Sequence, residues 1–285
     1  MKKAKSFGVR GMSAEERAAV NPYLGYRVAS GGVTAASVHD VDQGLRSFMM
    51  QVYLYMGAAL VVTATAAMFT FMASTTTELA HAARDPFGAG VEFRPGLYLT
   101  PFGWDINSYP ISYFIGFGPL LMLMVCAPVF RGLNSILAGL VFLLVATLIG
   151  VSFSTIAMNY GATSITRVFF TTAAAFGGLS LVGYCTTKDL SGWGSFLWMG
   201  VIGIIVAAVV NLFMDSDALQ FAICSIGVLV FSGFTAYDTQ SIKEGYSGRL
   251  SSEEADALAI NGALDLYLDF VNLFYFLIRL TGDDE

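Results

Sequence analysis

Residues 263–280 read ALDLYLDFVNLFYFLIRL, an apolar stretch long enough to cross a bilayer that nevertheless carries two aspartates. A helix rises about 1.5 Å per residue, so about 20 mostly apolar residues span roughly 30 Å of hydrocarbon. An ionisable group at that depth costs about 2.5–3.5 kcal/mol on insertion scales, and such groups usually face the interior of a helix bundle. The stretch therefore predicts a transmembrane helix with one polar face.

Six further apolar segments precede this stretch, which predicts an all-α integral membrane protein with seven transmembrane helices. The chain is 55% hydrophobic and 13% charged, with a mean hydropathy of +0.65, whereas soluble domains carry about 25% charged residues. A net charge of −6 leaves no basic face for a nucleic acid. The high hydrophobic fraction and the low charged fraction make the lipid bilayer the expected partner. The predicted spans are residues 48–73, 110–130, 133–156, 168–187, 194–213, 218–239 and 263–280.

The segments outside these spans differ in character. Residues 1–47 form a polar leader, which we expect to be mobile and cytoplasmic. It has no apolar core of the kind found in signal peptides. The membrane domain, 48–281, includes a long non-cytoplasmic loop at 74–109, and residues 282–285 form an acidic tail. Aromatic residues late in the loop fit an interfacial belt, and a partner-binding loop is the alternative.

The positions of the basic residues predict the orientation. Most of the 15 Lys and Arg residues fall on the side that carries the N-terminus, which favours a cytoplasmic N-terminus. With seven spans, the C-terminus then lies outside. The exceptions are Arg84, Arg94, Arg167 and Arg279.

No pattern in the chain predicts an enzyme or a bound cofactor. The three cysteines lie in apolar stretches without CxxC spacing, and no Walker loop, GxGxxG or GxSxG occurs. An intramembrane aspartyl protease also uses two aspartates. The pair Tyr237 and Asp238 matches its YD motif, but Asp269 lies in YLDF and not in GxGD. The sequence therefore favours a non-enzymatic protein.

Four polar residues of the last two spans are candidate functional residues. Asp265, Asp269 and Asn272 are spaced to share one helix face, and Asp238 lies near the end of the sixth span. The sixth span ends and the seventh begins on the same, cytoplasmic side of the membrane. Asp238 and Asp269 are therefore expected at similar depth. Two adjacent carboxylates would share a proton, which predicts a proton-sensitive element.

Each candidate also has a simpler interpretation. Asp269 could be a neutral, hydrogen-bonded packing group, and Asp265 a solvated charge near the helix end. Asp238 could be an interfacial charge, and Asn272 an interhelical contact. Arg131, at the cytoplasmic end of the second span, could pair with Asp238 or could simply anchor that span on the positive side of the membrane.

Two segments carry a family resemblance. FTAYDTQSIK, together with ALDLYLDFVNLFYFLIRLTG, resembles the C-terminal signature of the transmembrane Bax inhibitor motif family, also called the Bax inhibitor-1 or YccA-like family. The segments LRSFMMQVYLYMGAALVVTATAA and TTAAAFGGLSLVGYCTTKDLSGWGSFL resemble its first and fourth spans. The resemblance implies six helices around a central seventh helix.

The resemblance also implies an activity, a calcium leak sensitive to pH, which we expect in a bacterial plasma (inner) membrane. The family's gating aspartates match Asp238 and Asp269, and a basic latch on the second helix corresponds to Arg131. Asp265 and Asn272 would be accessory groups, and Asp238 with Asp269 would bind calcium weakly, because calcium prefers six to eight oxygen ligands. The alternative is an interaction protein that modulates a membrane protease or a stress or cell-death pathway.

Overall fold

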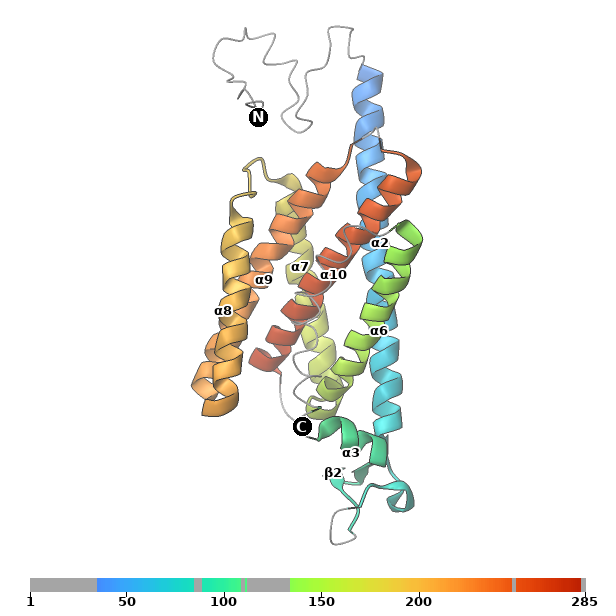
Figure 1. Ribbon diagram of the computed structural model, residues 1–285, viewed down its shortest axis with the longest axis vertical. Coiled ribbons are helices and arrows are strands. Elements are labelled where there is room, and N and C mark those ends of the chain that lie inside the picture. The colour runs from blue at the N-terminus through green and yellow to red at the C-terminus, as the bar shows by residue number, and fades with distance from the viewer. Residues whose placement is uncertain (1–34, 85–88, 109–110, 112–133, 248–249, 283–285) are drawn as a thin grey trace, which may run out of the picture.

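The computed structural model describes residues 35–84, 89–108, 111, 134–247 and 250–282. The described chain is mainly helical, which confirms the predicted all-α membrane protein (Figure 1). Its α-helices are α2 (Ala35–Ser74), α3 (Pro101–Asn107), α6 (Ser135–Asn159), α7 (Ala162–Cys185), α8 (Trp193–Met214), α9 (Asp217–Gly245) and α10 (Ser252–Thr281).

Five of these helices, α2 from Gln43 onward and α6 to α9, are long and apolar enough to cross a membrane. They occupy the positions of five predicted spans. Helix α10 occupies the position of the seventh, and its aspartates lower its hydropathy. The second predicted span, 110–130, lies outside the described residues except for Ile111.

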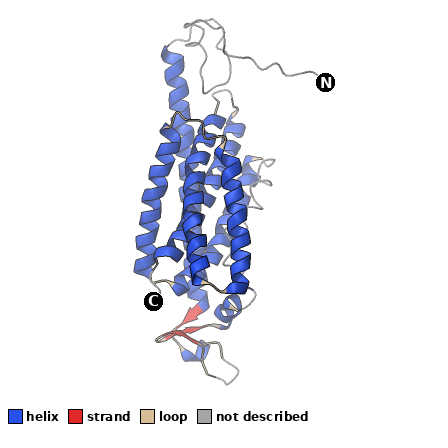
Figure 2. Ribbon diagram, turned by 90° about the vertical axis from the view of Figure 1, so that its left-hand side faces the viewer, coloured by secondary structure: helices blue, strands red, loops and turns tan. Residues whose placement is uncertain are grey.

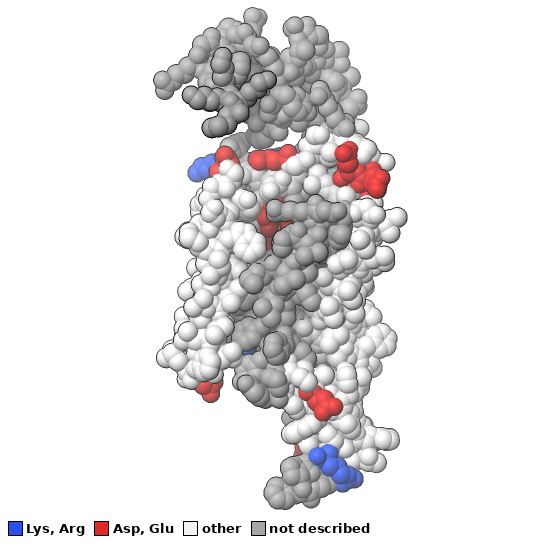
Figure 3. Space-filling view, in the orientation of Figure 1, with Lys and Arg blue, Asp and Glu red and all other residues white. Residues whose placement is uncertain are grey.

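The surface of the bundle suits contact with lipid. On the face shown in Figure 3, most of the acidic and basic side chains lie near the two ends of the bundle, and the described residues visible between them are mainly of other kinds. Many large apolar side chains of the bundle are exposed, whereas a soluble protein would bury such side chains. They include Leu54, Val61, Phe69, Leu140, Leu144, Phe170, Leu181, Phe196 and Leu229.

Helix α10 lies in the middle of the described helices, as the resemblance predicts (Figure 1). It packs against α2, α6, α7 and α9, and every residue from Leu266 to Phe274 is buried. A helix buried on all faces belongs to the core of a bundle. The aspartates of α10 are therefore held away from lipid by its neighbours.

Side-chain caps define where two of the helices begin. The Asn134 side chain accepts a hydrogen bond from the Leu137 amide at 2.9 Å and starts α6. Ser251 and Glu254 form a capping box that starts α10. Hydrogen bonds from the Ser251 backbone and hydroxyl hold the pKa of Glu254 below its ordinary value, so this support is lost as the pH falls through that lowered pKa.

Four helices extend at least six residues beyond the predicted spans. Helix α2 begins at Ala35, inside the predicted leader, α7 begins at Ala162, α9 continues to Gly245, and α10 begins at Ser252. The extended end of α2 contacts the end of α9: a β-carbon at Gly44 would lie 2.6 Å from the hydroxyl of Tyr246, the residue that follows α9. Phe48, one turn further along α2, stacks on the same ring with centroids 4.8 Å apart. Hydropathy detects only the part of a helix that lies in lipid, so it misses ends that pack together outside.

The predicted loop at 74–109 is a small folded unit at one end of the bundle (Figure 2). Strands β1 (Thr75–Thr76), β3 (Leu97–Leu99) and β2 (Glu92–Arg94) form an antiparallel sheet in that order. The strands are too short for an alternating pattern to reveal them in the sequence.

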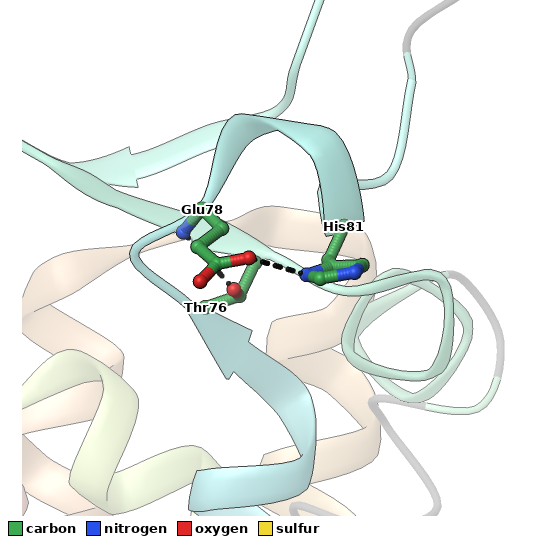
Figure 4. Close-up of polar contacts among 3 residues, drawn as sticks. All are labelled: Thr76, Glu78 and His81. Atoms are coloured by element: carbon green, nitrogen blue, oxygen red, sulfur yellow. Dashed lines mark hydrogen bonds and ion pairs between the residues drawn. The ribbon is translucent and has the colours of Figure 1, made fainter.

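A 3₁₀ turn, η1 (Leu79–His81), follows β1. In Figure 4 the Glu78 amide donates to the Thr76 hydroxyl at 3.1 Å, and the Glu78 carboxylate lies 2.9 Å from Nδ1 of His81. The ionisable partners are both exposed, so the contact shapes the turn and adds little stability.

This unit, residues 75–107, is fixed to the bundle by polar contacts. Arg94 donates from Nη2 to the Met158 carbonyl at 2.8 Å, and Asn107 donates from Nδ2 to the Met158 sulfur at 3.0 Å. Gly103 of α3 lies so close to Ser74 that a β-carbon there would overlap the Ser74 backbone. The unit is therefore docked on the ends of α2 and α6.

Tyr267 joins three helices inside the bundle, and removing its hydroxyl should destabilise the protein. It is fully buried, and its hydroxyl lies 2.7 Å from that of Thr63 on α2, which itself reaches the Ala146 carbonyl of α6 at 3.0 Å. Tyr267→Phe should cost about 1 kcal/mol. Thermal unfolding in detergent measures the loss, and in a double-mutant cycle Thr63→Val should add little to it. Independent, additive losses would contradict the link.

Candidate functional site

The candidate site is centred on Asp269 in the middle of α10. Its side chain is only 1% exposed. Both of its carboxylate oxygens are buried, and no described donor satisfies either of them when the group is ionised. A buried ionised carboxylate without a donor is costly, so the surroundings of Asp269 must offset this charge or remove it.

Asp238 of α9 is the group that faces Asp269. Both Asp238 and Asp265 lie near enough to Asp269 to interact with it through their charges. Two carboxylates this close repel each other, and binding one proton relieves that repulsion. The structure therefore brings Asp238 and Asp269 close together, as expected from the sequence.

The antiparallel packing of α9 on α10 produces this pairing. Phe276 stacks on Phe231 with centroids 5.8 Å apart on one side of the pair. On the other side, a β-carbon at Gly262 would lie 3.0 Å from Ile242. Because α9 continues to Gly245, Asp238 lies within the helix and not at its end. The paired carboxyl groups are thus held by close contacts above and below.

Asn272, predicted as an accessory group, is on the same face of α10 and is fully buried. Its amide donates to the Leu268 carbonyl at 2.7 Å, and its Oδ1 has no partner among the described residues. Asp265 is half-buried. The predicted latch, Arg131, lies outside the described residues, so its role stays a prediction.

A chain of hydroxyl groups beside Asp238 was not predicted. The Thr239 hydroxyl lies 2.9 Å from that of Ser180 on α7, which in turn bonds to the Tyr53 hydroxyl of α2. Thr235 and Thr239, one turn apart and both fully buried, could have indicated a polar face on α9. Their partners on α7 and α2 left no signal, because the spacing between helices is not visible in the sequence.

Gln240 holds the loop between α7 and α8 close to the aspartates. Its Nε2 donates to the Lys188 carbonyl at 2.8 Å, and its Oε1 accepts from the Leu190 amide at 2.8 Å. Both ends of one buried amide are thus satisfied by the backbone of a single loop. Any rotation of α9 that moves Asp238 must also move this loop.

Gln240→Leu should release that loop. The Leu190 amide should exchange its hydrogen about tenfold faster, which corresponds to about 1.4 kcal/mol, since it loses its acceptor. Hydrogen exchange with mass spectrometry measures the change. Gln220→Leu, a change on the same helix far from the loop, is the control. Equal exchange at Leu190 in wild type and Gln240→Leu would show that the contact does not hold the loop.

The described residues contain no group of three or more His, Cys, Asp or Glu side chains arranged to hold a metal ion. What the site offers is a protonatable carboxyl pair, a third carboxyl nearby and an amide oxygen. Such a set exchanges protons readily and attracts cations, but it offers fewer oxygens than tight calcium binding requires.

Comparison with known proteins gives consistent relatives. The family described as "Inhibitor of apoptosis-promoting Bax1" matches residues 45–285. The inner membrane protein YbhL of Escherichia coli is 35% identical over 87% of this chain and 96% of its own length. An uncharacterized protein of Caulobacter vibrioides is 40% identical over 86% of this chain and 92% of its own. The uncharacterized protein RP147 of Rickettsia prowazekii is 39% identical over 88% of this chain and 95% of its own length.

The family match covers the whole membrane domain, including both aspartate-bearing helices, and the relatives align over nearly their full length. The central α10 and the paired aspartates are features that the resemblance implied. The chain is therefore a member of the Bax inhibitor-1 family of membrane proteins.

Proposed function

We propose that this protein is a pH-sensitive calcium leak channel or transporter, gated by the Asp238 and Asp269 pair. The observation that supports the proposal best is the proximity of Asp238 to Asp269, a buried carboxyl group on the central helix. A proton held there neutralises one of the two negative charges in the bundle. When the proton leaves, two carboxylates are exposed to each other, and a cation is the group that relieves their repulsion.

Calcium is the preferred cation on chemical grounds. Hard divalent cations bind carboxylate oxygens, and two or three carboxylates give weak binding that permits release. The ion is cargo here, and the proposal includes no resident cofactor and no enzymatic step.

The proposed setting is a bacterial inner membrane with the N-terminus in the cytoplasm. A relative named as an inner membrane protein supports the location, and the distribution of basic residues supports the orientation. The acidic pair then lies toward the cytoplasmic side, and the unit at 75–107 lies on the opposite side.

The direct test is calcium flux in proteoliposomes that contain the purified full-length protein. Flux above that of protein-free liposomes, and dependent on pH, supports the proposal. Flux that equals the lipid background at every pH between 5 and 9 would contradict it. Cleavage of a membrane-embedded peptide reporter by the same preparation would favour the intramembrane protease instead.

A second candidate function is modulation of a membrane protease or a stress pathway by direct contact. The folded unit at 75–107 favours it, because a docked sheet offers a fixed surface that a simple connecting loop lacks. Deleting residues 1–34 and, separately, replacing residues 77–98 by a short Gly/Ser linker separates the candidates. A leak should survive both changes, whereas a contact function should be lost in at least one.

A further inference from the structure

The polar face of α10 extends beyond the aspartates in both directions. Asn261, Asp265, Asp269 and Asn272 follow one another at intervals of four, four and three residues, so their side chains share one face of the helix. Phe276 continues this face and stacks on Phe231 of α9. The stripe of four residues is thus directed at α9 and at Asp238.

The two asparagines of the stripe are held in the same way. Asn261 donates from Nδ2 to the Ala257 carbonyl at 2.8 Å, and Asn272 donates from Nδ2 to the Leu268 carbonyl at 2.7 Å. Each bond fixes the amide, so that the oxygen faces away from the helix backbone. In both residues this Oδ1 is buried and has no partner among the described residues.

The Asn272 side chain lies beside the turn of α10 that carries Asp269. Side chains of a helix lean toward its N-terminus, and the bond to Leu268 holds the Asn272 amide beside the turn that carries Asp269. The two Cα atoms are separated by about 4.5 Å along the helix axis. Asp269 itself has two buried oxygens that lack a described donor. Three oxygens without a donor therefore lie within one turn.

The site closes just beyond Asn272. Phe276 and Phe231 stack across the interface, and a β-carbon at Gly227 would strike the Phe276 ring. Thr235, the fully buried hydroxyl at this level of α9, already donates to the Phe231 carbonyl at 2.8 Å. Along the polar face of α10, Asn272 therefore lies between a carboxyl group, Asp269, and the aromatic rings of Phe276 and Phe231.

We propose that Asn272 is a cation ligand that works with Asp269, and that Asn261 repeats this role nearer the α9–α10 loop. A neutral amide oxygen replaces a water of a hard cation without adding charge, so an ion can pass from one oxygen to the next and leave again. This inference rests on the proposed leak function, and it names residues that carry the ion rather than the proton.

Terbium binding tests the ligand role without any flux measurement. Tb³⁺ is a hard cation of calcium-like ligand preference, and Tyr237, next to Asp238 in the chain, is expected to sensitise its emission. In the purified full-length protein, Asn272→Leu should weaken Tb³⁺ binding about tenfold, and added Ca²⁺ should displace the ion. Asn159→Leu is the matched control, because Asn159 makes the same type of bond to the Thr155 carbonyl, at 2.8 Å, on an exposed face of α6.

Asn272→Asp separates a ligand from a packing group. It keeps an oxygen but loses the donor to Leu268, so a purely structural role predicts that Asp and Leu fail alike. A ligand role predicts Tb³⁺ binding at least as tight as wild type in Asn272→Asp, together with the loss in Asn272→Leu.

The outcomes for the two proposals differ. Wild-type Tb³⁺ affinity in both Leu variants, Asn272→Leu and Asn261→Leu, would overturn the ligand assignment even if the protein leaks calcium. If Tb³⁺ binding depends on Asn272 but the protein shows no calcium flux, the proposed leak function is overturned and the proposed cation site is retained.

Discussion

Replacing Asp269 by Asn should reduce calcium flux at least tenfold at the pH where the wild type is most active, and should remove the pH dependence of the flux. An amide keeps the volume of the side chain but neither ionises nor shares a proton with Asp238. At about 4 Å and an effective dielectric constant of about 20, one unit charge attracts another by about 4 kcal/mol. Losing it removes most of the attraction for a cation.

The sign of the pH effect follows from the exchange of a proton for a cation. In the wild type the shared proton occupies the pair at low pH, so flux should rise with pH as that proton leaves. In Asp269→Asn the flux should stay low and flat. Proteoliposomes loaded with a calcium dye and assayed between pH 5 and 9 measure both features.

Two further variants make the result specific. Asp238→Asn should behave like Asp269→Asn, because either change removes one of the two carboxyl groups whose charges interact. Asp265→Asn should retain most of the pH dependence, since Asp265 interacts with Asp269 only through its charge. An unchanged flux and pH profile in both Asp238→Asn and Asp269→Asn would leave the site without a gating role.

Gly183→Ala should be the most damaging single-methyl change in the bundle. Here α7 crosses α9 so closely that a β-carbon would overlap the backbone carbonyl of Ala236. Backbone cannot move aside as a side chain can, so the helices must separate. Overpacking of this kind costs about 1–3 kcal/mol or more. The separation would also stretch the contact between Ser180 and Thr239, which lies beside the aspartates.

The matched control is a glycine on the same helix. A β-carbon at Gly178 would meet nothing within 4 Å, so Gly178→Ala should be neutral or stabilise by up to about 1 kcal/mol through helix propensity. Thermal unfolding of the purified variants, followed by loss of the monodisperse peak in gel filtration, measures both. Equal melting temperatures for the two would show that α7 and α9 separate easily at this crossing.

Much of the architecture was predictable because lipid imposes a simple rule on the sequence. A helix that crosses a bilayer must be apolar over a fixed length, and five of the predicted spans coincide with α2 and α6 to α9. The same rule made Asp269 conspicuous, since a charge inside such a segment is expensive. Asp265 and Asn272 were then found from helical spacing alone.

Features outside the lipid followed no such rule. The sheet at 75–99 was expected to be a loop, because strands of two or three residues leave no periodic pattern. The early start of α2 and the long end of α9 depend on contacts such as Gly44 against Tyr246, between residues far apart in the chain.

The sequence by itself determined that the chain is a helical membrane protein with acidic groups in its last two long helices, because hydropathy and helical spacing are local properties. Only the tertiary structure decided which of these groups meet. The link between Asp238 and Asp269, the partners of Gln240 and Ser180, and the fit of Gly183 against Ala236 all depend on how helices cross. Crossing is set by contacts summed over whole helix faces, and no single segment encodes it.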